Sequence, residues 1–231
     1  MTRLFLTLLL LATAAITQAS ESDQPSARII YLVRHGQYVA DPAADEKLGP
    51  GISPLGAAQA SLVGARLAGL PERFDAFHVS PLQRARDTAA IIGKSFPGSQ
   101  FDVVDDLAEC TPPTRNKPLM AQERPAELAA CAAQLDRVFA KYFVPALGSA
   151  QTEMFVCHGN VIRSLVVRAI GVDADSWLGM SPGHASITKI RIEADGRMQV
   201  ISVGDVGHLP ANLLTGASGD AERSLAIPAS P

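Results

Sequence analysis

An apolar run near the N-terminus constrains the fold more than any other stretch of the sequence. Residues 29–33, IIYLV, are followed at once by Arg34, His35, Gly36 and Gln37. A continuous, largely β-branched and aromatic run that ends at a glycine is typical of a strand buried on both faces of a parallel sheet. In open α/β sheets, sites collect at the carboxyl ends of such strands. We therefore predict a site where this strand ends.

Further strands and helices alternate along the chain. Strands are predicted over residues 75–80 and 100–104 and over a stretch that ends at Cys157. Helices are predicted to begin at Ser53-Pro54, Ser80-Pro81, Pro125 and about Asn160, where capping residues or proline precede apolar residues at helical spacing. Residues 186–193 and 198–203 alternate around Asp195-Gly196, which predicts a hairpin. Residues 105–124 show no regular period and are predicted to form a loop leaning over the site.

This alternation predicts an α/β fold, a three-layer sandwich with a mostly parallel central sheet and helices on both faces. The chain has 231 residues, of which 47% are hydrophobic and 19% charged, as expected for one domain of this class. The formal net charge is −3, so no basic surface for nucleic acid is expected. The sequence shows no internal repeat and leaves the oligomeric state open.

The first 19 residues differ from the rest. Arg3 precedes an apolar run from Leu4 to Ile16, and small residues lead up to Ala19. This pattern predicts a secretory signal peptide that is cut after Ala19 and a protein that is periplasmic or secreted. The run is shorter than the roughly 20 residues that span a bilayer, so no stable membrane insertion of the mature chain is expected, although an uncleaved anchor stays open. Residues 20–27 are predicted to be a disordered leader, 28–210 the domain and 211–231 a loose tail.

Export would place the three cysteines, Cys110, Cys131 and Cys157, in an oxidising compartment. At least one of the three must then stay unpaired within the chain. Cys157 lies in an apolar strand and is expected to be a buried thiol. Cys110 and Cys131 flank a loop and an early helix and could pair, but the sequence alone does not settle the connectivity.

Three motifs follow one another in the order LVRHG at 32–36, SPLQRARDTA at 80–89 and FVCHGN at 155–160. Together they resemble the histidine phosphatase superfamily, which has the phosphoglycerate mutase-like fold, over residues 28–210. The RHGQY start, the CHGNVIR segment and the GDVGHLP stretch are most similar to the branch of the mitochondrial PGAM5-type phosphatases. The resemblance implies a metal-independent phosphoric monoester hydrolase of the histidine acid type that needs no cofactor. Its substrate would be a phosphorylated small molecule or a phosphoprotein.

The resemblance also implies roles for individual residues. His35 matches the histidine that becomes transiently phosphorylated, and Arg34, Arg84 and His158 match the phosphate pocket. Glu109 follows the third strand near the place of the family's proton donor, with Asp105 and Asp106 as rivals. Gln37, Asn160 and His184 are expected to add hydrogen bonds to the phosphate.

These residue types suit phosphoryl transfer on physical grounds as well. A phosphoryl group in flight spreads negative charge over its equatorial oxygens, and the planar fork of arginine can donate two bonds to such a group. A neutral imidazole whose other nitrogen is held as a donor presents a lone pair for attack. Gly36 and Gly159 are expected to leave room for the phosphate, and a helix starting near Asn160 would direct backbone N–H groups toward it.

Four other interpretations compete with this one. A phosphomutase of this fold carries a longer lid after the third strand than residues 105–124 provide, and a non-catalytic phosphate- or phosphoprotein-binding module is expected to have lost His35 or an arginine. A Cys157–His158 thiol pair is disfavoured because neighbouring strand residues point to opposite faces. A metal site made of His35, His158 and Glu109 lacks a short-spaced ligand pair.

Overall fold

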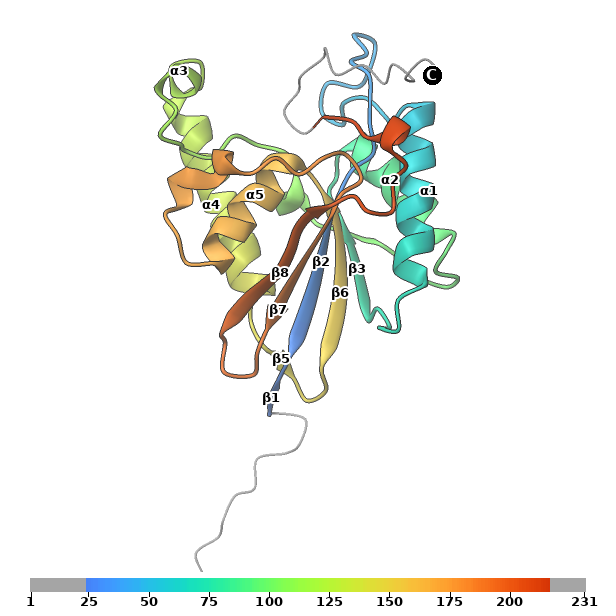
Figure 1. The fold of residues 1–231 in the computed structure, drawn as a ribbon. Helices are drawn as coiled ribbons and strands as arrows, with labels where there is room; N and C mark the ends of the chain where they lie inside the picture. The colour runs from blue at the N-terminus through green and yellow to red at the C-terminus, as the bar shows by residue number, and fades with distance from the viewer. Residues whose placement is uncertain (1–23, 217–231) are drawn as a thin grey trace, which may run out of the picture.

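The computed structural model describes residues 24–216, in which a central sheet lies between two layers of helices (Figure 1). The six-stranded sheet has the order β4-β3-β6-β2-β7-β8. Its strands are β2 (Arg28–Arg34), β3 (Ala76–Val79), β4 (Asp102–Val103), β6 (Gln151–Cys157), β7 (Ile187–Ile192) and β8 (Met198–Asp205). β4, β3, β6 and β2 run parallel, whereas β7 and β8 add an antiparallel hairpin. The predicted mostly parallel three-layer fold is confirmed.

Helices cover both faces of this sheet. α1 (Pro54–Ala68) and α2 (Gln83–Gly93) pack on one face, and α4 (Pro125–Tyr142) and α5 (Gly159–Ala169) pack on the other (Figure 1). The shorter elements are α3 (Lys117–Met120) and the 3-10 turns η2 (Asp105–Leu107), η3 (Ala174–Gly179) and η4 (Ala211–Leu213). The predicted loop over residues 105–124 therefore contains two short helical turns.

The first strand illustrates why two helix layers form. Ile30 and Leu32 belong to the core cluster beneath α4 and α5, whereas Tyr31 and Val33 belong to the cluster beneath α1 and α2. Successive strand residues point to opposite faces, so a strand that is apolar at every position needs cover on both sides. Each fully buried side chain of this kind contributes about 1.5–3 kcal/mol.

Helix starts follow the sequence signals with one exception. Ser53 caps α1 as predicted, because its hydroxyl accepts from the backbone N–H of Gly56 at 3.1 Å. The predicted start at Ser80-Pro81 is wrong by about two residues, since α2 begins at Gln83. The hydroxyl of Ser80 instead lies 2.6 Å from a nitrogen of His158.

Both predicted loose ends contain ordered residues. β1 (Pro25–Ser26), which falls in the predicted leader, pairs antiparallel with β5 (Ala146–Leu147) at the end of the sheet where β2 starts (Figure 1). In the predicted tail, the carbonyl of Leu213 and the hydroxyl of Thr215 accept from the side-chain amide of Gln59 at 2.7 and 2.9 Å. The leader and tail predictions are therefore wrong for these residues. The predicted signal peptide, residues 1–19, lies outside the described residues.

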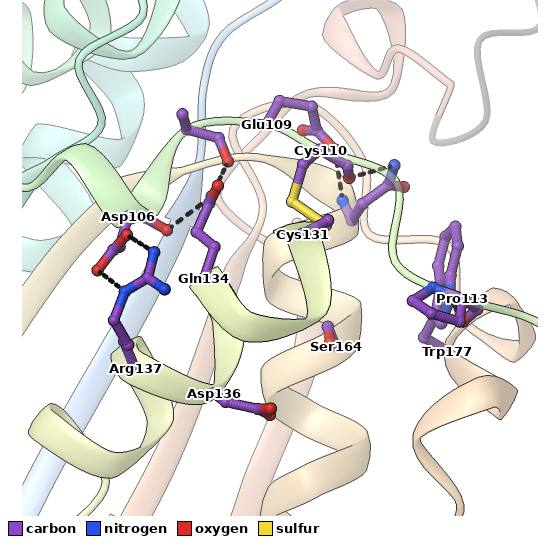
Figure 2. Close-up of a disulfide and its surroundings, with 12 residues drawn as sticks. Asp106, Glu109, Cys110, Pro113, Cys131, Gln134, Asp136, Arg137, Ser164 and Trp177 are labelled. Carbon is purple, nitrogen blue, oxygen red and sulfur yellow. Dashed lines mark hydrogen bonds and ion pairs between the residues drawn. A yellow bond between two sulfur atoms is a disulfide. The ribbon is translucent and has the colours of Figure 1, made fainter. Parts of the chain in front are cut away.

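The cysteines pair in the way that the sequence left open. Cys110 and Cys131 form a disulfide (Figure 2). Cys157 is free and buried. Burial raises the pKa of the Cys157 thiol far above its ordinary value, which leaves it unreactive. Within residues 24–216, none of the helices has the length and apolar character that crossing a membrane requires.

Candidate active site

A cavity of about 420 Å³ opens at the carboxyl ends of β2 and β6. Its walls come from five separate parts of the chain: Arg34, His35, Tyr38, Arg84, Glu109, Gly159, Asn160, Arg163, Leu178 and Ser181. A larger hollow of about 790 Å³ lies around the end of α1 and the start of β3, but its lining holds no histidine and a single arginine. The chemistry-bearing residues therefore collect in the smaller cavity.

His35 directly follows β2 and is 2% exposed. Its Nδ1 lies 2.8 Å from the carbonyl oxygen of Gly36, which can only accept, so Nδ1 carries the proton. Arg84 Nε donates to Nε2 of His35 at 3.2 Å, which places the lone pair on Nε2. Burial, followed by the electrostatic influence of His158 and the two arginines, holds the pKa of His35 well below its ordinary value. The ring is thus a neutral imidazole in one tautomer.

Two arginines flank this ring. Arg34, the last residue of β2, donates through Nη1 to the carbonyl of Pro182 at 2.8 Å and through Nη2 to Nε2 of His184 at 3.3 Å. Arg84, the second residue of α2, lies over the ring of Tyr38 at 5.2 Å. Burial lowers the pKa of Arg34 to about 10 and also lowers that of Arg84. With its pKa at about 10, Arg34 remains charged at neutral pH.

Glu109 faces the arginines from the opposite wall with a side chain 25% exposed. Its Oε1 accepts from the backbone N–H of Asn160 at 3.1 Å, at the first turn of α5. Burial within the cavity wall raises the pKa of Glu109, although Arg34 and the bond from Asn160 oppose this shift. A carboxyl group that keeps its proton to higher pH than usual is suited to donating that proton.

The rival carboxylates lie elsewhere. Asp106 forms an ion pair with Arg137 on the outer side of α4, with Nε to Oδ2 at 3.0 Å (Figure 2). Asp105 is exposed, and neither residue lines the cavity. Geometry therefore favours Glu109 among the three acids.

His158 is fully buried behind the cavity, with its ring centroid 5.0 Å from that of His35. Its Nε2 lies 2.6 Å from the hydroxyl of Ser80, and its Nδ1 lies 3.6 Å from Oε2 of Glu109. Burial first, and then the charges of the site arginines, lowers the pKa of His158 well below its ordinary value. A second neutral imidazole thus lies between the nucleophile candidate and the acid candidate.

Some predicted phosphate-binding residues take other positions. The amide of Gln37 donates to the carbonyl of Tyr38 at 2.9 Å and accepts from the hydroxyl of Ser53, and Gln37 does not line the cavity. His184 lies 5.4 Å from the His35 ring, where it accepts from Arg34. Asn160 does line the cavity, as predicted for a residue at the start of α5.

Gly36 and Gly159 play different parts. A Cβ on Gly36 would lie 2.6 Å from the carbonyl oxygen of Gly56, so glycine is needed there for packing against α1 rather than for access by a phosphate. A Cβ on Gly159 would meet the Arg34 guanidinium at 3.4 Å. Gly159 therefore leaves room beside the arginine.

Sequence reasoning did not find Tyr38, Arg163, Leu178 and Ser181. Arg163 follows Asn160 by one helical turn on α5, and it donates to Asn160 Oδ1 at 3.2 Å. The i,i+3 spacing from a predicted site residue was a usable signal for it. Leu178 and Ser181 come from η3 and the segment after it, for which the sequence carries no such signal.

The described residues hold no group of three or more His, Cys, Asp or Glu side chains arranged to bind a metal ion. The site instead combines three arginines, one carboxyl group and two neutral imidazoles. This set binds and transfers groups rich in negative charge.

Comparison with known proteins gives the family and the similar relatives of this chain. The model of the histidine phosphatase superfamily (branch 1) matches residues 30–136. The mitochondrial serine/threonine-protein phosphatase Pgam5 of Caenorhabditis elegans is 36% identical over 200 residues, which cover 84% of this chain and 69% of the relative. The human mitochondrial serine/threonine-protein phosphatase PGAM5 is 33% identical over 192 residues, which cover 81% of this chain and 66% of the relative.

Solved structures show the same fold. A phosphoglycerate mutase from Plasmodium falciparum matches with a TM-score of 0.57 at 24% identity, over 80% of this chain and 96% of that one. A mycobacterial glucosyl-3-phosphoglycerate phosphatase matches with a TM-score of 0.58 at 22% identity, over 77% and 99%. At these identities the likeness concerns the fold alone.

The relatives also correct the predicted location. The Caenorhabditis elegans Pgam5 and human PGAM5 phosphatases are mitochondrial, which contradicts the predicted export to a periplasm or to the medium. The basic start and apolar run were thus a poor guide to destination.

Proposed function

The chain belongs to the histidine phosphatase superfamily, in the branch of the PGAM5-type phosphatases, and is a phosphatase; from this premise we propose that it hydrolyses phosphate monoesters through a phosphohistidine on His35. The observation that carries the proposal is the tautomer of His35. Its Nδ1 proton is held by the Gly36 carbonyl, and Nε2 offers its lone pair beside Arg84. A nucleophile toward phosphorus needs this arrangement.

In the first half of the reaction, Arg34 and Arg84 bind the phosphate dianion, and the first turn of α5 adds backbone N–H groups. Arg84 Nε transfers its hydrogen bond from His35 to a phosphate oxygen, which frees the lone pair. The bond from Nε2 to phosphorus forms as the bond from phosphorus to the ester oxygen breaks. Glu109 gives its proton to the departing oxygen, so the product is an alcohol and not an alkoxide.

In the second half, a water molecule attacks phosphorus on the side opposite Nε2. The Glu109 carboxylate takes the proton of this water, the phosphorus–nitrogen bond breaks, and inorganic phosphate leaves. His35 returns to the neutral form and Glu109 to the protonated form. His158 is proposed as a catalytic residue that supports the loss and recovery of the Glu109 proton, since its Nδ1 lies 3.6 Å from Oε2 of Glu109.

Phosphoserine or phosphothreonine in a protein is the substrate class that the relatives' names support. We propose further that no metal takes part, because His35 supplies the nucleophile and the three arginines supply positive charge. Activity should then be unchanged in EDTA. A phosphomutase and a non-catalytic binding module are not favoured, since the relatives are phosphatases.

The test is to trap the intermediate. The enzyme is mixed with a phosphoserine peptide labelled with radioactive phosphorus and quenched in alkali within a fraction of a second. Acid-labile label should appear on the peptide that contains His35, and His35→Ala should lose both the label and turnover while unfolding at the same temperature. Unlabelled enzyme together with a retained rate in His35→Ala would reject the nucleophile.

A further inference from the structure

The segment that carries Glu109, residues 105–111, is here called the acid loop. Its first half is a single turn, in which the N–H groups of Leu107 and Ala108 donate to the carbonyls of Val104 and Asp105 at 3.0 Å. From Glu109 to Pro113 the chain belongs to no helix or strand. The backbone beside Glu109 is thus held by something other than the sheet.

One covalent bond lies next to Glu109. Cys110, the following residue, is joined to Cys131 on α4 (Figure 2). Cys131 is 2% exposed and belongs to the core cluster between α4 and the sheet, so the bridge anchors the loop to the core. Cys131 does not line the cavity.

Two amide side chains hold the backbone of the same loop. Gln134 Nε2 donates to the carbonyls of Asp106 and Ala108 at 2.9 and 2.8 Å. Gln134 stands three residues after Cys131, so both lie on one face of α4 (Figure 2). From the other side, Asn160 Nδ2 donates to the carbonyl of Cys110 at 3.2 Å.

We propose that the Cys110–Cys131 disulfide, with Gln134 beside it, is the positioning element that keeps Glu109 within reach of the leaving oxygen. The inference rests on the proposed function, in which Glu109 is the proton donor. Proton transfer needs the donor within about 2.6–3.2 Å of the oxygen that it protonates, or one water away. Freed from Cys131, residue 110 keeps the hydrogen bond from Asn160 and its packing against the core, but Glu109 loses the covalent support of its neighbour.

A positioning role makes a specific kinetic demand. An alkyl phosphate releases a poor leaving group and depends on the proton from Glu109, whereas p-nitrophenolate leaves readily without one. Displacing the acid by about 1 Å should therefore slow alkyl phosphates by about 10- to 100-fold. The release of p-nitrophenolate in the first turnover should change by less than about threefold, because that step does not need the general acid.

The test compares four enzymes: wild type, wild type reduced with tris(2-carboxyethyl)phosphine, Cys131→Ala and Glu109→Gln. Reduction adds two electrons and two protons to the disulfide and converts the phosphine to its oxide. Each enzyme is assayed on a phosphoserine peptide and, for the first-turnover burst, on p-nitrophenyl phosphate. The burst serves as an internal control for folding. Cys131→Ala treated with the phosphine should show no further change.

We expect the reduced enzyme and Cys131→Ala to lose rate on the phosphoserine peptide while they keep the p-nitrophenolate burst. Reoxidation should restore the rate of the reduced enzyme. Gln134→Ala should show a smaller loss of the same kind. If Glu109→Gln loses the peptide rate selectively while the reduced enzyme and Cys131→Ala do not, the positioning role is overturned and the proposed function stands. If Glu109→Gln shows no selective loss, the acid assignment fails and the positioning role fails with it.

Discussion

The two walls of the cavity are held in different ways. Arg34 and His35 prolong β2, and their backbone N–H groups donate to the carbonyls of Ser186 at 3.1 Å and Cys157 at 2.9 Å. Glu109 stands in a loop fixed by a disulfide and by two amide side chains. The proposed nucleophile thus shares the stability of the sheet, whereas the position of the proposed acid depends on a few groups that can be removed one at a time. Mutations can therefore alter the position of Glu109 while leaving His35 in place.

The largest effect is expected from removing the proposed proton donor, Glu109. Glu109→Gln should lose about 10²- to 10⁴-fold on alkyl phosphates, or roughly 3–5 kcal/mol of barrier, because the leaving oxygen then departs without a proton. On p-nitrophenyl phosphate it should give a burst and then slow turnover, since water attack on the phosphohistidine still needs the base. Stopped-flow kinetics measures both phases. Equal losses on both substrates without a burst would reject Glu109 as the proton donor and move the role to His158.

The second prediction removes one of the arginines that we propose bind the phosphate. Arg84→Ala should cost about 10²-fold or more in rate on alkyl and aryl phosphates alike, by analogy with the loss of one oxyanion donor. Unlike the loss at Glu109, this one should not depend on the leaving group, because the phosphoryl charge is the same in both. Arg84→Lys is the matched control and should recover part of the rate. A leaving-group-dependent loss would show that Arg84 acts on the proton donor instead.

The third prediction concerns stability. The bridge closes a loop with a sequence separation of 21, for which chain entropy gives about 3 kcal/mol. Cys131→Ala should lower the free energy of unfolding in urea by about this amount, with a somewhat steeper slope against denaturant because the unfolded chain becomes less compact. The control is to add the reductant to Cys131→Ala. This variant has no disulfide left to reduce and Cys157 is already a buried free thiol, so its stability should not change. A loss well under 1 kcal/mol would mean that Gln134 and the core suffice to close the loop.

The fourth prediction concerns pH, to which the buried histidines and Glu109 respond with opposite signs. Burial holds the pKa of His184 at about 3, against an ordinary value of 6.5, and His35 and His158 shift in the same direction. A lowered histidine pKa gives stability that is present above the ordinary value and is lost as the pH falls. Between pH 6.5 and 4, the free energy of unfolding should therefore fall by up to about 1.4 kcal/mol per pH unit for each such histidine.

Urea titrations at several pH values measure this dependence. In His184→Gln, the free energy of unfolding should fall less steeply with decreasing pH, by the contribution of one histidine. Glu109 has the opposite sign, because its raised pKa costs stability as the pH rises, so Glu109→Gln should be more stable than wild type at pH 7. An unchanged slope in His184→Gln would show that the ring is charged in the folded protein.

Sequence patterns predicted the elements and the nucleophile wall because these are local. Ile30 to Val33 show a buried strand by composition, and Ser53 and Pro125 mark helix starts by their side chains. The acid loop has no period, so Glu109 was found through the family resemblance and its neighbours remained open. Pro25 and Ser26 were missed because a two-residue strand shows no alternation. Gln37 was predicted to bind the phosphate, but its amide oxygen accepts from the hydroxyl of Ser53, a contact that no local sequence pattern reveals.

The short pairing of β1 with β5 decides where anything joined ahead of Gln24 is attached. That pairing lies at the end of the sheet where β2 starts, while the cavity opens where β2 finishes (Figure 1). At the other end of the described chain, Thr215 lies 2.9 Å from Nδ1 of His184 beside the site. A fusion partner or solid support on the N-terminal side would therefore leave substrate access open, whereas one placed directly after Thr215 would stand beside the entrance.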